Sequence, residues 1–169
     1  MNLNRVLRHL LSVLLLPFTV TFIVPRWLLA KPGSLWTAPA LILVGRISGA
    51  LVFFAGLSLF AWCVSLFARV GQGTLAPWDP TRRLVAVGPY RYVRNPMISG
   101  VAAMLVGETL FFGSTALAAW SAGFVIVNHI YFLHSEEPGL ERRFGADYVN
   151  YKKSVPRWWP RLRPWSGTA

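Results

Sequence analysis

Long runs of hydrophobic residues, separated by short polar or proline-rich stretches, dominate the chain. Four such runs can be drawn, at about 7–29 and 41–67 and as the two halves of 96–134 on either side of Gly113-Ser114. The hydrocarbon core of a bilayer requires about 18 or more apolar residues in a helix that crosses it. The pattern therefore predicts an all-α integral membrane protein with about four transmembrane helices, the last two forming a tight antiparallel hairpin.

The first two runs contain prolines, which kink a helix, and glycines, which allow two helices to pack closely. The first run resembles a signal peptide, but it continues to Ala30 without a small-x-small cleavage site, so we expect a retained span. Pro17 and Pro25 predict a kink there. In the second run, Gly45 and Gly49 form a small-xxx-small pair that favours the close approach of another helix.

Two polar segments interrupt this pattern. The segment 69–95 is rich in arginine, glycine and proline, and its interleaved aliphatic and tyrosine residues indicate an ordered, functional loop. The C-terminal segment begins with acids and predicts an amphipathic interfacial helix over about 137–153. Trp158, Trp159 and Trp165 follow it, and tryptophan is typical of the membrane headgroup region.

Composition supports a membrane protein and argues against a nucleic-acid-binding protein. The chain is 54% hydrophobic and only 14% charged, with a net charge of +11. The basic residues flank the apolar runs, as expected beside anionic lipid, and we predict no nucleic-acid partner.

The positive-inside rule places both termini and the 69–95 loop in the cytoplasm. Cys63 is the single cysteine, so neither an internal disulfide nor a cysteine metal site is possible.

Ionisable residues in or near the spans are the candidates for chemistry, because each is costly in lipid. They are Glu108, His129 and the adjacent pair Glu136 and Glu137. In a regular helix His129 and Glu136, seven residues apart, share a face. Adjacent carboxylates need a cationic partner or ligand, which Arg91 and Arg94 could supply, or else they form a solvated helix start.

Other catalytic patterns are missing from the sequence. There is no spaced set of histidine, cysteine or carboxylate ligands, so no metal is predicted. A nucleotide-binding glycine motif and a nucleophile triad are also missing. Glu108 and His129 each have a structural alternative, as a carboxylate satisfied by a neighbouring helix and as a packing histidine.

One set of motifs in the second half of the chain resembles, in its order and spacing, the motifs of a known enzyme superfamily. Gly88-Pro-Tyr-Arg-Tyr-Val-Arg-Asn-Pro-Met97 is followed by Glu136-Glu137, Phe144-Gly145, Tyr148, Tyr151 and Val155-Pro156. This order and spacing resemble the isoprenylcysteine carboxyl methyltransferase and phospholipid methyltransferase superfamily. The resemblance implies a division into N-terminal transmembrane helices (1–68) and a methyltransferase catalytic region (69–169), in which the loop and C-terminal helix form a pocket for S-adenosylmethionine.

The resemblance also implies roles for individual residues. The cofactor-binding set would be Leu84, Val85, Gly88, Tyr90, Asn95, Pro96 and Glu136, and the catalytic candidates are Arg94, Glu137 and His129. Two positions depart from the family pattern. Asn95 stands where the family usually has histidine, and Phe132 stands where the eukaryotic carboxyl methyltransferases have the arginine that binds a substrate carboxylate. Asparagine at 95 can still form the hydrogen bonds that cofactor binding needs but cannot titrate. The departure at Phe132 argues against a prenylcysteine carboxylate as the substrate.

The sequence thus predicts an S-adenosylmethionine-dependent membrane methyltransferase. Its acceptor would be an amphiphilic or lipid-like molecule that enters from the bilayer, and membrane lipids would surround it. Two alternatives remain open at this point: a membrane NADPH-dependent sterol-type reductase and a non-catalytic membrane adaptor. The identity of the acceptor and the oligomeric state stay undetermined.

Overall fold

The computed structural model describes residues 14–70 and 84–167, and these residues are helical with connecting loops, as predicted. The helical elements, in chain order, are η1 (Leu14–Ile23), α2 (Val24–Leu28), α3 (Pro39–Val70), η2 (Gly88–Arg91), α4 (Pro96–Phe112), α5 (Thr115–Tyr131), η3 (Phe132–Glu136), α6 (Glu137–Phe144) and α7 (Ala146–Ser154). Of these, η1 and η3 are π-helical and η2 is a 3₁₀ turn.

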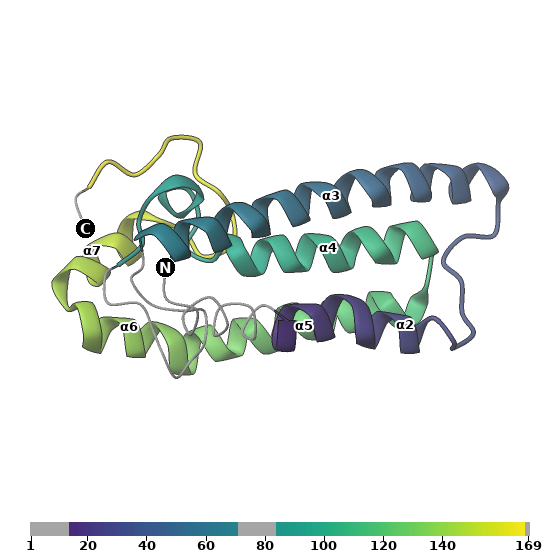
Figure 1. The fold of residues 1–169 in the computed structure, drawn as a ribbon, viewed down its shortest axis with the longest axis horizontal. Helices are drawn as coiled ribbons and strands as arrows, with labels where there is room; N and C mark the ends of the chain where they lie inside the picture. The colour runs from purple at the N-terminus through teal and green to yellow at the C-terminus, as the bar shows by residue number, and fades with distance from the viewer. Residues whose placement is uncertain (1–13, 71–83, 168–169) are drawn as a thin grey trace.

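The long helices pack side by side and leave one polar end. α3 and α4 run antiparallel in extensive contact, α5 packs against α4, and η1 and α2 contact α4 and α5 (Figure 1). The end of α3 and the start of α4 lie at the same end of the molecule as η2, α6, α7 and the C-terminal segment (Figure 1). Most polar residues of the described chain that could carry chemistry therefore gather at this end.

Glycines allow α3 and α4 to approach closely. A Cβ atom added at Gly49 would lie 2.6 Å from the carbonyl oxygen of Gly107, and one at Gly56 would lie 2.6 Å from that of Gly100. At Gly45 the added atom would lie 2.8 Å from a backbone carbonyl of α4. Contacts this short exclude any side chain, since real Cβ atoms do not approach backbone oxygens so closely. The predicted close approach at Gly45 and Gly49 is confirmed, and the partner is α4.

The hairpin between α4 and α5 turns at the predicted position. Gly113 ends α4 in the left-handed conformation (φ 61°), which glycine adopts without steric cost. Ser114 then caps α5, and its side chain accepts a hydrogen bond from the backbone N–H of Leu117 at 3.4 Å. The backbone N–H of Leu35 donates to the carbonyl oxygen of Gly113 at 2.6 Å, so the segment before α3 closes over this turn.

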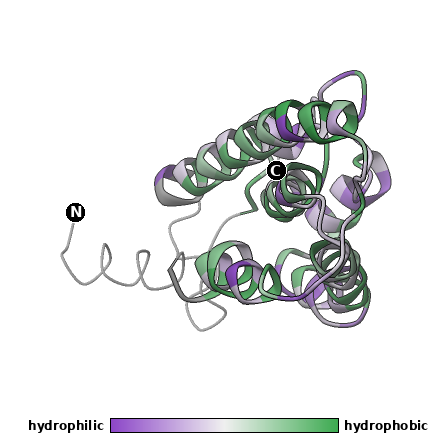
Figure 2. Ribbon diagram, turned by 90° about the vertical axis from the view of Figure 1, so that its right-hand side faces the viewer, coloured by the Kyte–Doolittle hydropathy of each residue, from purple (hydrophilic) through white to green (hydrophobic). Residues whose placement is uncertain are grey.

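Within residues 14–70 and 84–167, two helices are long and apolar enough to cross a membrane, Pro39–Leu66 and the continuous helix Thr115–Phe144. Their outward faces are hydrophobic, as Leu51 (67% exposed) and Val127 (65% exposed) show. Hydrophobic residues, in green, make up much of the helices (Figure 2). The helices Leu16–Leu28 and Pro96–Phe112 are shorter. At 1.5 Å per residue the 17 residues of α4 extend about 26 Å, near the lower limit for a span.

The count of four spans therefore stays a prediction. The first predicted span, 7–29, begins outside the described residues, and residues 71–83 of the predicted 69–95 loop also lie outside them. The predicted second span, 41–67, lies within α3, which extends three residues further, to Val70.

The predicted single C-terminal helix over 137–153 is wrong in one respect. The chain forms two helices there, α6 and α7, because Gly145 between them adopts φ 55° and ψ −130°, outside helical geometry. This break turns α7 so that Tyr148, Tyr151 and Val155 pack with Ala86 in a buried hydrophobic cluster. α7 is thereby tied to the loop that precedes α4.

Candidate functional site

The segment Leu84–Val87 is extended, so successive side chains point to opposite sides. Leu84 packs against the buried cluster of α7, whereas Val85 packs with Cys63 of α3 and with Tyr90. Gly88 (φ 56°) then turns the chain into η2. A Cβ atom at Gly88 would meet only the flexible end of Leu66, at 2.9 Å, so it is the positive φ of the turn that favours glycine there.

Tyr90 is the buried centre of this loop. Its backbone carbonyl accepts a hydrogen bond from the hydroxyl of Tyr151 at 2.7 Å. Burial raises the pKa of Tyr90 well above its usual range, and surrounding charges, that of Glu136 among them, raise it further. Asn95 is half-buried and precedes α4, where its carbonyl accepts from the backbone N–H of Ser99 at 3.0 Å. Pro96 is buried in the first turn of α4.

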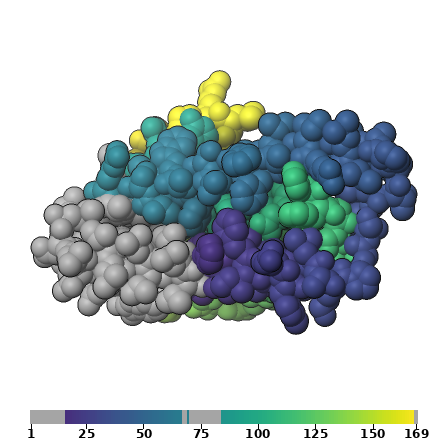
Figure 3. Space-filling model, turned by 45° about the vertical axis from the view of Figure 1, so that its right-hand side comes forward, coloured from purple at the N-terminus to yellow at the C-terminus, as the bar shows by residue number. Residues whose placement is uncertain are grey.

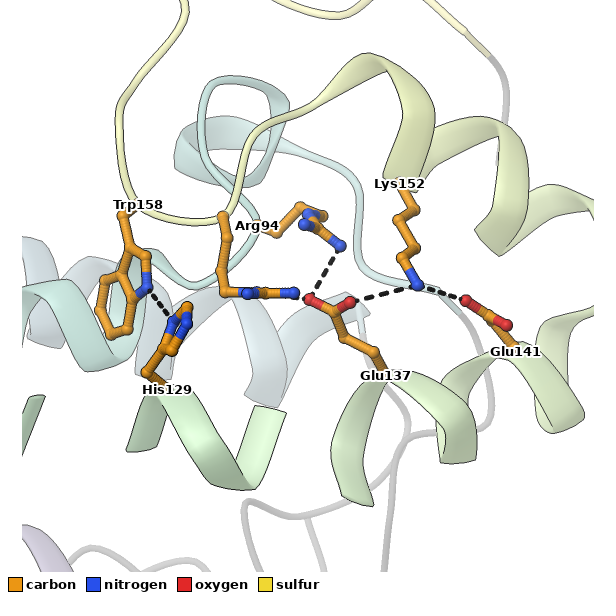
Figure 4. Close-up of polar contacts among 7 residues, drawn as sticks. Arg94, His129, Glu137, Glu141, Lys152 and Trp158 are labelled. Carbon is orange, nitrogen blue, oxygen red and sulfur yellow. Dashed lines mark hydrogen bonds and ion pairs between the residues drawn. The ribbon is translucent and has the colours of Figure 1, made fainter. Parts of the chain in front are cut away.

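Glu137 is a buried carboxylate surrounded by cations from three segments of the chain. Its Oε1 atom accepts a hydrogen bond from Nε of Arg157 at 2.7 Å and lies 2.9 Å from Nη1 of Arg94. Its Oε2 atom lies 3.3 Å from Nζ of Lys152, which also donates to Glu141 at 2.6 Å. Figure 4 shows these side chains pointing toward one another. A buried carboxylate paired this fully is held in one position and keeps its charge.

Arg94 is also buried, with its side chain only 10% exposed. Although Nη1 contacts Glu137 as an ion pair, neither Nη1 nor Nε of Arg94 has a hydrogen-bond partner among the described residues. Buried guanidinium N–H groups normally have acceptors, so these two nitrogens lack the hydrogen-bond acceptors that would be expected for them. Arg91, the other expected partner of the acidic pair, instead donates from Nε to the carbonyl oxygen of Trp165 at 2.6 Å.

Glu136 differs sharply from its neighbour. It is half-buried, and within residues 14–70 and 84–167 it makes no hydrogen bond or ion pair. It lies close enough to the phenols of Tyr90 and Tyr148 to influence both. Burial raises the pKa of Tyr148 to about 12, and the charges of Glu137 and Glu136 raise it while that of Arg94 lowers it. Glu137 therefore has its full set of cationic partners, whereas the carboxylate of Glu136 can still accept one.

A π-helical turn explains why the two acids differ. Seven residues separate His129 from Glu136, and a regular helix would put both on one face. The turn η3 between them adds about one residue to the helical turn, so the residue that shares the face of His129 is Glu137. Both of these residues contact the C-terminal segment, His129 through Trp158 and Glu137 through Arg157. The expected common face of His129 and Glu136 is therefore corrected.

His129 is half-buried on α5 and is paired with an indole. Nε1 of Trp158 donates a hydrogen bond to Nδ1 of His129 at 3.0 Å, and the two rings are stacked with centroids 6.4 Å apart (Figure 4). Phe132 contacts the other part of the same indole, with ring centroids 5.7 Å apart. The histidine thus anchors the C-terminal segment to α5.

Glu108 lies outside this group. It is buried in α4, twelve residues beyond Pro96, which places it about 18 Å further along the helix. Its Oε2 atom has no hydrogen-bond partner in the described part of the chain. In that same part, no three histidine, cysteine, aspartate or glutamate side chains come together in a way that could hold a metal ion.

The sequence did not single out three residues that complete the group, namely Lys152, Arg157 and Trp158. The helical spacing of Tyr148, Tyr151 and Val155 indicates a buried face of α7 that places Lys152 beside it. No comparable pattern surrounds Arg157 and Trp158, because they lie in an irregular segment whose course depends on tertiary contacts.

The chain is similar to one known protein family over most of its length. No match is found among curated proteins. The family model for phospholipid methyltransferases matches residues 38–147, more than half of the 169 residues, and this range contains the loop from Leu84 to Pro96 and the acidic pair. The chain therefore belongs to the phospholipid methyltransferase family, whose members are methyltransferases that use S-adenosylmethionine.

Proposed function

We propose that this chain transfers a methyl group from S-adenosylmethionine to an amphiphilic, phospholipid-type acceptor that reaches the site from the bilayer. Family membership makes the chain a membrane methyltransferase, which favours this reaction over a nicotinamide-dependent reductase or a non-catalytic adaptor. The roles of individual residues are part of the proposal.

The contrast between Glu136 and Glu137 carries the proposal. Glu137 already has three cationic partners, whereas the half-buried carboxylate of Glu136 has none within the described residues. An unpaired, partly desolvated carboxylate beside a second carboxylate is unfavourable unless a cation joins it. A cationic ligand at Glu136 would relieve this cost.

The described residues fit S-adenosylmethionine. This cofactor combines a sulfonium and an amino group with a carboxylate and an aromatic base. Glu136 offers an open carboxylate for the cationic groups, and Nε of Arg94 offers a buried N–H without an acceptor. Tyr90 supplies a buried aromatic ring at the same end of the helices. Opposite charges are thus available together, beside a loop that is held by the buried ring of Tyr90.

We assign the remaining predicted residues to binding and to positioning. Leu84, Val85, Gly88, Asn95 and Pro96 shape the loop that presents Tyr90, and with Tyr90 and Glu136 they form the proposed cofactor-binding set. Glu137 and His129 act as positioning residues, because their side chains are engaged with Arg94 or with the C-terminal segment, whereas Arg94 is held by Glu137 and offers Nε to the cofactor. When bound, the cofactor supplies an electrophilic methyl group on its sulfonium.

Methyl transfer is an in-line displacement that depends on alignment and on exclusion of water more than on acid or base catalysis. This requirement suits a site in which Glu137 is buried and is fixed by ion pairs to Arg94, Lys152 and Arg157. The exposed apolar faces of α3 and α5 border lipid, so an acceptor with acyl chains can approach without leaving the bilayer. We place the site on the cytoplasmic side on the basis of the arginine-rich loop, and we assign catalysis to residues 69–169.

Calorimetry of the detergent-purified protein with S-adenosylhomocysteine tests the proposal. Glu136→Gln nearly preserves shape but removes a charge-assisted contact, worth about 1.5–3 kcal/mol. The affinity should fall by about ten- to a hundredfold. Asp147→Asn is the matched control, since Asp147 is an exposed acid of α7 at the same end of the molecule.

The outcomes are distinct. Equal losses in the two variants, or no loss in a folded Glu136→Gln protein, would show that the acidic pair is not the cofactor site. Binding of NADPH without any binding of S-adenosylhomocysteine would instead support the reductase.

A further inference from the structure

The C-terminal segment Val155–Trp165, which we call the strap, is fixed at several points along its length. The backbone N–H of Arg94 donates to the carbonyl of Pro156 at 2.9 Å, and that of Arg161 donates to the carbonyl of Tyr92 at 3.0 Å. The backbone N–H of Trp165 donates to the carbonyl of Arg91 at 2.9 Å. The strap is thus paired with the loop residues directly before α4, at the level where that helix begins.

The strap's hydrophobic residues divide into two sets. Trp158 faces inward against His129, and Trp165 packs against Tyr151 with ring centroids 5.3 Å apart. Trp159 is 84% exposed and Leu162 is completely exposed. The placement of the three tryptophans at headgroup level stays a prediction; Trp158 and Trp165 pack against protein, and Trp159 is the exposed one of the three.

The exposed pair cannot easily turn inward. Trp159 lies between the pairings of Pro156 and Arg161, and Leu162 lies between those of Arg161 and Trp165. In Figure 3 the C-terminal segment, in yellow, projects from the surface of the molecule. A tryptophan and a leucine held outward on a fixed segment indicate a surface that meets a partner.

The chain that carries this pair is positively charged. Residues 148–167 contain the cations Lys152, Lys153, Arg157, Arg161 and Arg163 and no acidic residue. Lys153 and Arg163 are exposed, and neither side chain forms an ion pair with the described residues. Exposed cations beside an outward tryptophan and leucine match the chemistry of an anionic phospholipid surface, where indole rings lie at headgroup level and basic groups meet phosphate.

We propose that the outer face of the strap, formed by Trp159, Leu162 and Arg163 with Lys153 nearby, docks on the anionic headgroup layer of the leaflet at this end of the helices. Trp159 and Leu162 insert among the lipid headgroups, and the two cations bind phosphate groups. Because the inner face of the same segment contacts His129 and Glu137, docking steadies the candidate site from outside. The proposal does not depend on which cofactor that site binds.

Spin-label accessibility on the full chain in phospholipid vesicles tests this proposal. Trp159→Cys and Leu162→Cys would each carry a nitroxide, with Asp147→Cys as the control on exposed α7. Cys63 is completely buried, so the wild-type protein should take up no label. Vesicles of phosphatidylcholine are compared with vesicles that also contain phosphatidylglycerol. Collisions with oxygen report lipid contact, and collisions with a water-soluble nickel complex report water.

The labels at positions 159 and 162 should shift from nickel toward oxygen collisions relative to the Asp147→Cys label, and more strongly when phosphatidylglycerol is present. The double variant Lys153→Gln/Arg163→Gln should lose the preference for phosphatidylglycerol. Water contact at both positions in both vesicles would overturn the proposal. Protection from both reagents would also overturn it, because it would show that protein covers the strap. Binding of S-adenosylhomocysteine, measured separately, tests the proposed function and leaves these outcomes unchanged.

Discussion

Trp158 and His129 form a hydrogen bond in which the indole N–H donates to Nδ1 of the imidazole at 3.0 Å. A neutral imidazole that accepts at Nδ1 carries its proton on Nε2. In this state neither ring nitrogen has a free lone pair, so the geometry suits an anchor for the strap and not a general base. The sequence alone could not separate these two roles.

Substitutions of His129 can show whether it acts as an anchor for the strap or as a general base. His129→Asn can place an amide oxygen near the position of Nδ1 and keep an acceptor for Trp158, whereas His129→Leu removes it. Loss of this hydrogen bond should cost about 0.5–1.5 kcal/mol. We expect His129→Asn to resemble the wild type in thermal midpoint and in turnover, and His129→Leu to have a lower midpoint. Abolished turnover in both variants at normal stability would establish a catalytic histidine.

Alkaline pH should destabilise the protein. Burial raises the pKa of Tyr148 to about 12, and it also raises the pKa values of Tyr90 and Tyr151. In the unfolded chain these phenols lose their protons near pH 10. The folded state therefore binds more protons above that pH, and stability that is fully present below about pH 10 is lost as the pH rises toward the folded values.

Thermal midpoints of the detergent-solubilised protein, measured between about pH 8 and pH 11, check this expectation. The midpoint should stay level at first and fall above about pH 10. Tyr148→Phe should show a shallower fall, because one of the three phenols is gone. A midpoint that does not change across this range would contradict the burial of these side chains.

The contact between α3 and α4 should not tolerate a methyl group at Gly107. An added Cβ there would lie 2.6 Å from the backbone nitrogen of Phe53. The helices must separate to accept it, at a cost of about 1–3 kcal/mol. At Gly123 of α5 nothing lies within 4 Å, so Gly123→Ala should be neutral or stabilising by up to about 1 kcal/mol. Thermal unfolding of both variants in one detergent gives the comparison, and equal midpoints would refute the close packing.

Orientation in the membrane can be tested with reporters fused after Ala169. The positive-inside rule puts the arginine-rich loop and the C-terminus in the cytoplasm. A fluorescent protein at this position should therefore be bright, and a phosphatase that folds only outside the cytoplasm should be inactive. The reverse pattern would place the loop and the candidate site on the other side.

The sequence predicted the helices where local patterns determine them. The break at Gly113-Ser114 follows from glycine at a left-handed position and serine at a helix start. The close approach at Gly45 and Gly49 follows from side-chain size alone. The pairing of Glu137 with Arg94 also follows from charge, since a buried carboxylate requires a cation.

The arrangement within the site was not predictable from such rules. The π-helical turn η3 leaves no mark in hydropathy, because a stretch such as Phe132–Glu136 is compatible with a regular helix as well. Arg157 reaches Glu137 across 20 residues of sequence through a turn at Gly145 and an irregular strap. These contacts depend on how the segments pack, and only Gly145 carries a local indication of the turn.

The π-helical turn also makes the number of residues between α5 and α6 matter independently of which residues they are. Removing one residue from this stretch would restore regular helical hydrogen bonds and so favour local helix formation. Because the π-helical turn holds one residue more than a regular turn, this deletion would leave α6 facing nearly as it does now, with Glu137 seven residues after His129 and still on its face. An insertion of one residue would instead rotate everything downstream by about 100°. Glu137 would then leave Arg94 and Arg157, although no functional side chain had been altered.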